Sequence, residues 1–318
     1  MIQDSKLIGL RAVKEKDIYN RLKDTLSSGH FACPGCGAIL GLRMALQVLA
    51  PRCIFVIPAC CMAVADGPYP MSALGVPLYH CAFASTAPVA AGISRALRKI
   101  GDDKTIVVGW AGDGGTFDIG FSGLSAAASR NDDILYVCYD NEAYMNTGIQ
   151  QSSATPEGAW TTTSPIHNPK KGSKKDVLTL LLAHRIPYMA SVNPAFPEDF
   201  FTKFERAIQT KGFRFIHLFS ACPPGHKSRE ADTIHISRLS VQTRVFPLYE
   251  VINGQVKITL DPPLRPVKDY ISLQGRFKHW DEFYIKRFCQ YLDEQWHWLK
   301  KLEEITDKVN NRELGIGT

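Results

Sequence analysis

The chain has 318 residues, of which 45% are hydrophobic and 21% charged, the composition of a globular protein of one or two domains. Its 37 basic and 31 acidic residues give a formal charge of only +6, which argues against a nucleic-acid-binding surface. The charged opening segment does not read as a signal peptide, and no apolar stretch could span a membrane. Nine cysteines, an odd number, disfavour a secreted disulfide scaffold and predict a cytoplasmic location.

Two cysteines lie close together near the start of the chain, in the segment FACPGCG. Cys33 and Cys36 form a C-x-x-C pair on a Pro-Gly turn, and we expect a helix to follow. Further ligands for a shared metal centre would come from cysteines that follow apolar strands, namely Cys60, Cys61 and Cys222. On the residues alone, an iron-sulfur cluster, a closed zinc site and a redox thiol pair all remain open.

A strand, a glycine-rich turn, a helix and a second strand are predicted in the middle of the chain. Apolar runs at 105–111 and 134–139 predict buried strands, and the small residues of 120–129 predict the helix. The first strand ends at Gly112-Asp113-Gly114-Gly115 and the second at Asp140-Asn141. In a βαβ unit both strand ends face the ligand side of the sheet, so these two polar clusters should meet there.

The two clusters together predict a magnesium diphosphate site. Glycines allow backbone N–H groups to approach phosphate oxygens, and a helix N-terminus favours negative charge. Asp113 and Asn141 provide the hard oxygen ligands that magnesium prefers. Asn141 follows Asp113 by 28 residues, and this spacing resembles that of thiamine diphosphate enzymes.

The remaining chain continues the alternation of helices and strands. A polar loop at 151–172 is long enough to suggest function, although His167 within it reads as a solvated histidine. Helices at 175–184 and 197–210 alternate with strands at 186–192 and 214–221. We therefore expect an α/β fold with a doubly wound parallel sheet. Its boundaries would be an N-terminal extension (1–26), one domain (27–225) and a C-terminal extended arm with a long helix (226–318).

The arm contains short extended runs at 247–266 and helical periodicity at 280–308. Two interpretations of its long helix remain open, a contact with a partner subunit or packing against its own domain.

The motifs HFACPGCG, GDGG, YDNEAYMNTG and ACPPG resemble those of the beta subunit of 2-oxoacid:ferredoxin oxidoreductases, most closely the pyruvate:ferredoxin (pyruvate synthase) type. The resemblance extends over residues 30–278. It implies a thiamine diphosphate-binding fold and a [4Fe-4S] cluster near the cofactor. Its implied cluster ligands are Cys33, Cys36, Cys61 and Cys222, with Cys60 as a competing ligand.

The same resemblance assigns the cofactor contacts. Magnesium would be held by Asp113, Asn141 and the carbonyl of Ala143, and the diphosphate would lie against Gly112, Gly114 and Gly115. Asn146 would direct its amide toward the reacting centre as a catalytic residue, although a turn-capping role is the alternative. Tyr144, Thr147 and Cys61 complete the implied set of cofactor-binding residues.

The implied reaction is a coenzyme A-linked oxidative decarboxylation of a small 2-oxoacid, with pyruvate as first choice, and transfer of single electrons through the cluster to ferredoxin. Thiamine catalysis also needs a glutamate from a pyrimidine-binding domain, which this chain lacks. We therefore expect alpha-, gamma- or delta-type partner subunits that supply the glutamate and further clusters.

One segment departs from the family pattern. The family's Asn-Ala-Thr-Gly-Cys is replaced by Ile57-Pro58-Ala59-Cys60-Cys61, close to the implied cofactor position. This departure favours an altered substrate, either oxalate without coenzyme A or a branched-chain 2-oxoacid. Two further alternatives are an iron-free thiamine diphosphate carboligase or decarboxylase subunit and a non-catalytic binding subunit with structural zinc.

Overall fold

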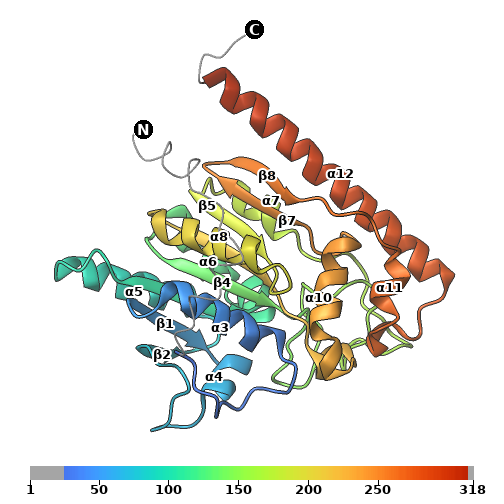
Figure 1. Ribbon diagram of the computed structural model, residues 1–318, viewed down its shortest axis with the longest axis horizontal. Coiled ribbons are helices and arrows are strands. Elements are labelled where there is room, and N and C mark those ends of the chain that lie inside the picture. Colours follow the sequence, from blue (N-terminus) through green and yellow to red (C-terminus); the bar gives the residue numbers. More distant parts are fainter. Residues whose placement is uncertain (1–24, 314–318) are drawn as a thin grey trace.

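The computed structural model describes residues 25–313, so nearly all of the expected N-terminal extension lies outside the described residues. Within this range eight strands form one sheet in the order β2-β1-β3-β4-β6-β5-β7-β8 (Figure 1). The strands are β1 (Cys53–Pro58), β2 (Leu78–Cys81), β3 (Ile106–Gly112), β4 (Leu135–Asp140), β5 (Tyr188–Val192), β6 (Arg214–Phe219), β7 (Leu248–Ile252) and β8 (Gln255–Leu260).

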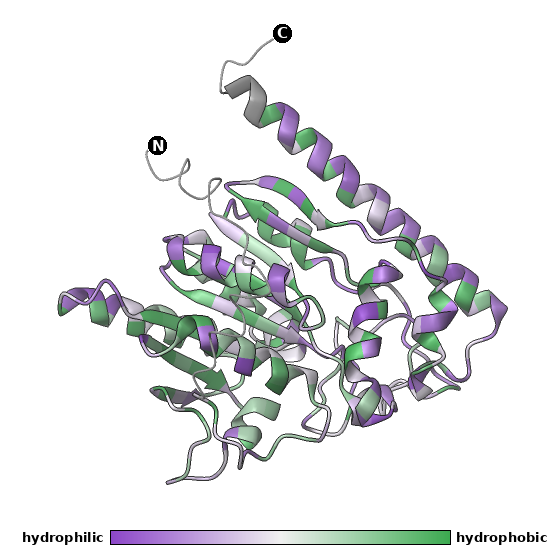
Figure 2. Ribbon diagram, viewed as in Figure 1, coloured by the Kyte–Doolittle hydropathy of each residue, from purple (hydrophilic) through white to green (hydrophobic). Residues whose placement is uncertain are grey.

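Helices cover both faces of this sheet. One apolar core lies between the sheet and α3 (Gly37–Leu49), α4 (Cys61–Asp66) and α8 (Pro197–Gln209). A second core on the other face contains residues of α5 (Thr86–Lys99), α6 (Phe121–Ser129), α7 (Val177–Leu182) and α12 (Glu282–Glu313). Strands buried on both faces need continuous apolar sequence, which is why the central strands are mostly green in Figure 2. The doubly wound α/β prediction is therefore confirmed.

The sheet is not parallel throughout. The first six strands in the order pair in parallel, but β7 pairs antiparallel with β5, and β8 antiparallel with β7. The extended runs expected in a separate arm thus form a hairpin that lengthens the sheet beyond residue 225. The hairpin joins the sheet because Leu248, Val251 and Val256 are buried in its cores.

Short helices connect the hairpin to the rest of the chain. They are α9 (Pro223–His226), α10 (Thr233–Gln242) and α11 (Val267–Ile271), with 3-10 turns η2 (Glu230–Asp232) and η3 (Gly275–Phe277).

The long helix α12 runs along one side of the molecule and extends past β8 (Figure 1). Trp296 and Leu299 are buried on the sheet, so the helix does pack on its own domain. Its other surfaces expose Phe283, Trp298 and Ile305, and the mixed colours of α12 in Figure 2 reflect this. No helix within residues 25–313 has the length and apolar character required to cross a membrane.

Candidate active site

A cleft of about 320 Å³ opens at the carboxyl ends of β3 and β4. It brings together nearly all of the residues predicted to contact the cofactor. The cleft is lined by Ala59, Cys60, Cys61, Phe83, Gly112, Gly114, Gly115, Tyr139, Asn141, Ala143, Tyr144, Met145, Asn146 and Thr147. Asn146 lies exposed in the turn between Tyr144 and Gln150, which pair as an isolated bridge.

The glycine-rich turn is shorter than expected. Gly112 is the last residue of β3, and a π-helical turn, η1 (Gly114–Ile119), begins two residues later and leads into α6. The helix predicted at 120–129 is confirmed as α6 (Phe121–Ser129), whereas the π-helical turn before it was not predicted. The chain can turn directly into a helix because the glycines leave room: a side chain at Gly114 would collide with the ring of Tyr144, and one at Gly115 would lie 3.1 Å from Phe83. The helix N-terminus consequently faces the cleft, where it favours an anion.

Three oxygen atoms converge beneath the cleft. The side-chain oxygen of Asn141 faces only acceptors, with the Asp113 carboxylate 2.9 Å away and the Ala143 carbonyl 3.0 Å away. Rotating the amide would satisfy both contacts with N–H donors, and a divalent cation among the three oxygens would satisfy them equally. Asp113 is completely buried, and burial followed by the nearby Asp140 raises the pKa of its carboxyl well above the usual range. A cation at this corner would hold Asp113 ionised, so the donor set fits magnesium.

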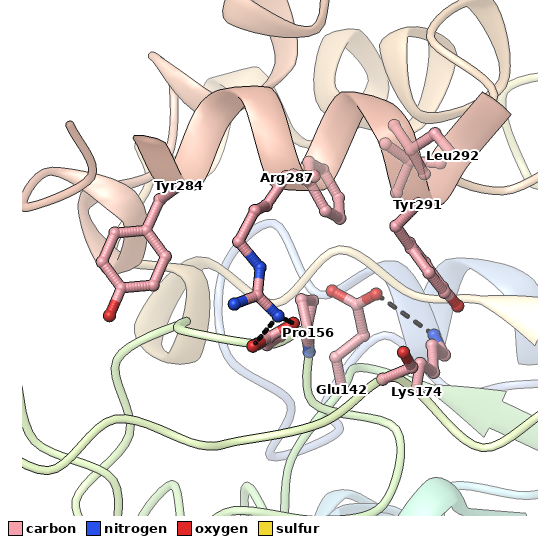
Figure 3. Close-up of a pocket in the computed structure, with 11 residues that line it drawn as sticks. Glu142, Pro156, Lys174, Tyr284, Arg287, Tyr291 and Leu292 are labelled. Carbon is pink, nitrogen blue, oxygen red and sulfur yellow. Dashed lines mark hydrogen bonds and ion pairs between the residues drawn. The ribbon is translucent and has the colours of Figure 1, made fainter. Parts of the chain in front are cut away.

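Buried charges surround this oxygen corner. Asp140 and Glu142 flank Asn141, and Lys174 reaches both, with its Nζ 2.5 Å from Asp140 Oδ2 and 3.1 Å from Glu142 Oε1. Burial alone would raise the pKa of Asp140, but Lys174 and then His217 hold it well below its usual range. Burial also opposes ionisation of Glu142, whose pKa is lowered by Lys174 and then Arg276. Figure 3 shows Glu142 and Lys174 facing each other beneath α12.

The polar loop after the cofactor motif forms hydrogen bonds to Asp113 of the oxygen corner and to neighbouring Glu142. Ser152 donates its hydroxyl hydrogen to Asp113 Oδ2 at 2.5 Å, and Thr155 donates to the carbonyl of Glu142 at 2.7 Å. This explains the length of the polar loop predicted at 151–172. His167 within it is exposed, in line with a solvated histidine.

Backbone hydrogen bonds join the three distant segments that carry the predicted cluster cysteines. Gly37, next to Cys36, donates its backbone N–H to the carbonyl of Ala221, next to Cys222, at 3.0 Å. Phe31 donates to the carbonyl of Ala65 in α4, the helix that begins at Cys61. The Pro-Gly turn itself requires glycine, because Gly35 has φ +70° and a side chain there would lie 2.6 Å from the carbonyl oxygen of Glu230.

Neighbouring thiols add to the effect of burial on the pKa values of Cys61 and Cys222. Burial raises the pKa of Cys222 to about 12, with a further contribution from Cys36 and Cys33. The pKa of Cys61 is likewise raised by burial and then by Cys222 and Cys60. Cys33 is exposed, whereas Cys60 is buried. Among residues 25–313, however, no three His, Cys, Asp or Glu side chains are grouped closely enough to hold a metal ion.

The cofactor cleft and the cysteine site share a wall. A side chain at Gly225 would collide with the sulfur of Met145 and lie 3.4 Å from the sulfur of Cys222. His226, fully buried, accepts the backbone N–H of Cys222 at Nδ1 (3.4 Å) and lies with Nε2 3.1 Å from the carbonyl oxygen of Asn141. One imidazole thus bridges a predicted cluster ligand and a predicted magnesium ligand.

Comparison with known proteins identifies the family. The model described as "Thiamine pyrophosphate enzyme, C-terminal TPP binding domain" matches residues 60–218, half of the chain. Ketoisovalerate oxidoreductase subunit VorB of Pyrococcus furiosus is 47% identical over 289 residues, covering 87% of this chain and 93% of that protein. Pyruvate synthase subunit PorB of Methanothermobacter thermautotrophicus is 43% identical over 275 residues, covering 85% and 96%. The chain is a 2-oxoacid:ferredoxin oxidoreductase beta subunit.

Among solved structures, 2-oxoglutarate:ferredoxin oxidoreductase from Magnetococcus marinus has the same fold as this beta subunit. The two superpose with a TM-score of 0.56 at 19% identity, over 83% of this chain and 94% of that chain. The family resemblance inferred from the motifs is therefore confirmed, and the matching domain model supports thiamine diphosphate as the cofactor of the enzyme. The beta subunit also contains residues that sequence analysis missed, namely Glu142, Ser152, Thr155, Lys174, His226 and Arg276.

Proposed function

We propose that this beta subunit binds the diphosphate end of thiamine diphosphate in the cleft, with magnesium at the oxygen corner. This proposal depends on one observation: the side-chain amide of Asn141 lies 2.9 Å from Asp113 Oδ1 and 3.0 Å from the carbonyl oxygen of Ala143, so three potential magnesium ligands meet at one corner. Gly112, Gly114 and Gly115 line the cleft, and glycines allow backbone N–H groups to approach phosphate oxygens. When bound, the cofactor supplies the carbanion chemistry that removes carbon dioxide from a 2-oxoacid.

The chain's own residues would orient the reacting groups. Asn146 and Thr147 are exposed on the cleft wall, where the amide of Asn146 can donate a hydrogen bond to developing negative charge. Tyr144 is held in place because its hydroxyl donates to Asp118 Oδ2 at 3.1 Å. Cys61 also lines the cleft, and as a cluster ligand it would place an electron acceptor beside the cofactor.

We assign Cys33, Cys36, Cys61 and Cys222 to a [4Fe-4S] cluster. The hydrogen bonds that join their three segments support this assignment, as does the contribution of neighbouring thiols to the raised pKa values of Cys61 and Cys222. Cubane ligation differs from a single-ion site because each thiolate binds a different iron. Cys60 is the weaker candidate, because its thiol is buried and lies near the Tyr139 side chain.

The substrate we propose is a small 2-oxoacid, with a branched-chain acid ahead of pyruvate. The ketoisovalerate relative is 47% identical to this chain over 289 aligned residues, and the pyruvate synthase relative 43% identical over 275. The cleft wall supports the same order, because Ala59 and Cys60 stand where the family has a Thr-Gly pair. Loss of the threonine hydroxyl leaves an apolar wall that suits an alkyl side chain. Oxalate, a dianion, fits this wall less well.

The assembly would also contain subunits that supply the activating glutamate and further clusters, and it would use coenzyme A and ferredoxin. We place it in the cytoplasm, because all nine cysteines are unpaired, as in a reducing compartment.

The test is anaerobic purification of the beta subunit with its copurifying partners, followed by cofactor analysis and ferredoxin-linked assays. We expect bound thiamine diphosphate, magnesium and iron, and a higher kcat/KM for 2-oxoisovalerate than for pyruvate, both dependent on coenzyme A. Activity with oxalate but without coenzyme A would overturn the substrate assignment. Carboligation by an iron-free assembly, or zinc in place of iron, would overturn the electron-transfer function.

A further inference from the structure

The segment that carries two of the three proposed magnesium ligands has an unusual backbone. Glu142, between Asn141 and Ala143, has φ +67°, in the left-handed region that residues with a Cβ rarely occupy. With this turn, the Asn141 side chain and the Ala143 carbonyl both reach the oxygen corner. Something other than local preference must hold Glu142 in place.

The side chain of Glu142 does not face the cofactor cleft. It is only 2% exposed and lines a separate cavity beneath α12 (Figure 3). There its two carboxylate oxygens are 3.1 Å from Lys174 Nζ and 2.5 Å from Arg276 Nη2. The Glu142 backbone is also fixed, because its N–H donates to Asp140 Oδ1 at 3.0 Å and its carbonyl accepts from Thr155 Oγ1 at 2.7 Å.

Lys174 ties this arrangement to the residue on the other side of Asn141. Its ammonium group contacts Asp140 as well as Glu142, so one cation bridges both neighbours of a proposed metal ligand. Lys174 is also mostly buried, with 16% of its side chain exposed. A hydrogen-bonded ion pair between buried groups has a defined geometry and is costly to break on one side only.

We infer that Glu142 and Lys174 are positioning residues, which hold the proposed magnesium ligands Asn141 and Ala143 in the geometry that the metal needs. We call this ion pair the Glu142–Lys174 clamp. The inference rests on the proposed magnesium site. It predicts that the pair controls affinity for the metal, whereas a pair with only a structural role would affect stability alone. Residues that orient metal ligands change metal affinity by about 10- to 100-fold when they are removed.

The same cavity provides a matched control. Arg287 and Glu157 form an ion pair of 2.8 Å at its rim, with side chains 55% and 30% exposed (Figure 3). An exposed pair of this kind contributes little. Arg287→Gln therefore alters the charge of the cavity without touching the proposed clamp.

The experiment uses the whole assembly, stripped of metal with a chelator and titrated with Mn²⁺ in the presence of thiamine diphosphate. Free Mn²⁺ is followed by electron paramagnetic resonance, and the KM for Mg²⁺ is measured in parallel. We expect Glu142→Gln and Lys174→Gln to raise the Kd for Mn²⁺ about 10- to 100-fold, with kcat largely recovered at saturating metal. Lys174→Arg should restore part of the affinity, and Arg287→Gln should behave as wild type.

Two further variants keep the test decisive. Glu142→Gly permits the positive φ but removes the side chain, so weakened Mn²⁺ binding in this variant assigns the effect to the anchor rather than to the backbone angle. If Lys174→Gln does not fold, the double variant Glu142→Gln/Lys174→Gln removes both charges together. A Kd within twofold of wild type in folded Glu142→Gln and in the double variant would overturn the inference.

Asp113→Asn separates this inference from the proposed function. If Asp113→Asn loses Mn²⁺ binding while Glu142→Gln retains it, the magnesium site at the oxygen corner is supported and the positioning role of the Glu142–Lys174 clamp is refuted. If Asp113→Asn binds Mn²⁺ as tightly as wild type, the metal lies elsewhere and the proposed magnesium site fails.

Discussion

The oxygen corner and the cysteine site lie side by side but are built in opposite ways. At the corner, Asp113 is completely buried, Asn141 is 4% exposed, and the surrounding charges find their partners within this chain. At the cysteine site, Cys33 is exposed, and backbone hydrogen bonds join the segments that carry the thiols. The corner is therefore specified by side chains of this subunit, whereas the cysteine site would gain its final geometry from the group that it binds.

The largest expected effect is at the cysteine site. Cys61→Ala should remove the proposed cluster, lowering the iron content by about four per beta subunit, because the cluster loses a thiolate ligand. Cys60→Ala should retain the iron, since Cys60 is read as a buried apolar side chain. Iron analysis and reduced-state electron paramagnetic resonance of the two assemblies decide between them. Loss of iron in Cys60→Ala alone would transfer the ligand role to Cys60.

The next effect tests how tightly the cleft is built. Gly114→Ala would place a methyl group against the ring of Tyr144, whose hydroxyl is held by Asp118. We expect the Kd for thiamine diphosphate to rise about 10-fold or more, which corresponds to a typical cost of overpacking. Gly92→Ala is the control, because a side chain at Gly92 meets nothing within 4 Å. Equal affinity in both variants would show that Gly114 is dispensable for the cleft.

A smaller effect, on Mn²⁺ affinity, is expected for Ser152, which contacts the proposed metal ligand Asp113 but is not a ligand itself. Ser152→Ala removes the hydroxyl that donates to Asp113 at 2.5 Å and leaves a buried carboxylate oxygen without this partner. Such a loss costs about 1–3 kcal/mol, so we expect roughly 10-fold weaker Mn²⁺ binding. Ser129→Ala, which removes an exposed hydroxyl 3.1 Å from His184, is the matched control. If Mn²⁺ binding to Ser152→Ala equals that of the control, Ser152 does not orient Asp113.

Much of the fold could be predicted from local sequence patterns, because apolar runs predict the parallel strands. Short motifs predict Asp113 and Asn141, which do lie side by side, and four cluster cysteines whose shared role stays a prediction. Lys174 and Arg276 could not be found in this way, because they lie 32 and 134 residues from Glu142 and meet it only in the folded chain. The only local signal for such partners was Glu142 itself, a charged residue just after the apolar strand β4. A charge buried at that position requires a counter-charge.

The hairpin of β7 and β8 was missed for a related reason. The prolines around it suggested an irregular arm, yet Pro247 precedes β7 and the next prolines follow β8, so both strands are free of proline. The pairing of β7 with β5 joins residues about sixty positions apart, for example Met189 with Val251, and no local pattern indicates it.

The smallest expected effect concerns the loop that supports the oxygen corner. Lys170 donates from Nζ to the carbonyl oxygens of Thr155, at 2.5 Å, and Ser153, at 3.2 Å. Burial, and then Lys174, lowers the pKa of Lys170 to about 8 from an ordinary value of 10.5. Between these values the unfolded chain binds more protons than the folded chain, so the contribution of Lys170 to stability rises with pH.

The glutamine of Lys170→Gln does not titrate. All other groups titrate in both proteins, so their effects cancel when the pH dependence of Tm is compared between the two. We therefore expect the Tm of the wild-type assembly, relative to Lys170→Gln, to increase by about 1–2 °C between pH 7.5 and 9.5. Thermal unfolding of both assemblies across this range measures the difference. A difference that stays constant or falls with pH would mean that the corner-supporting loop is open enough for Lys170 to keep the pKa of a solvated lysine. In that case the oxygen corner would be more accessible to solvent, and would differ less from the partly exposed cysteine site.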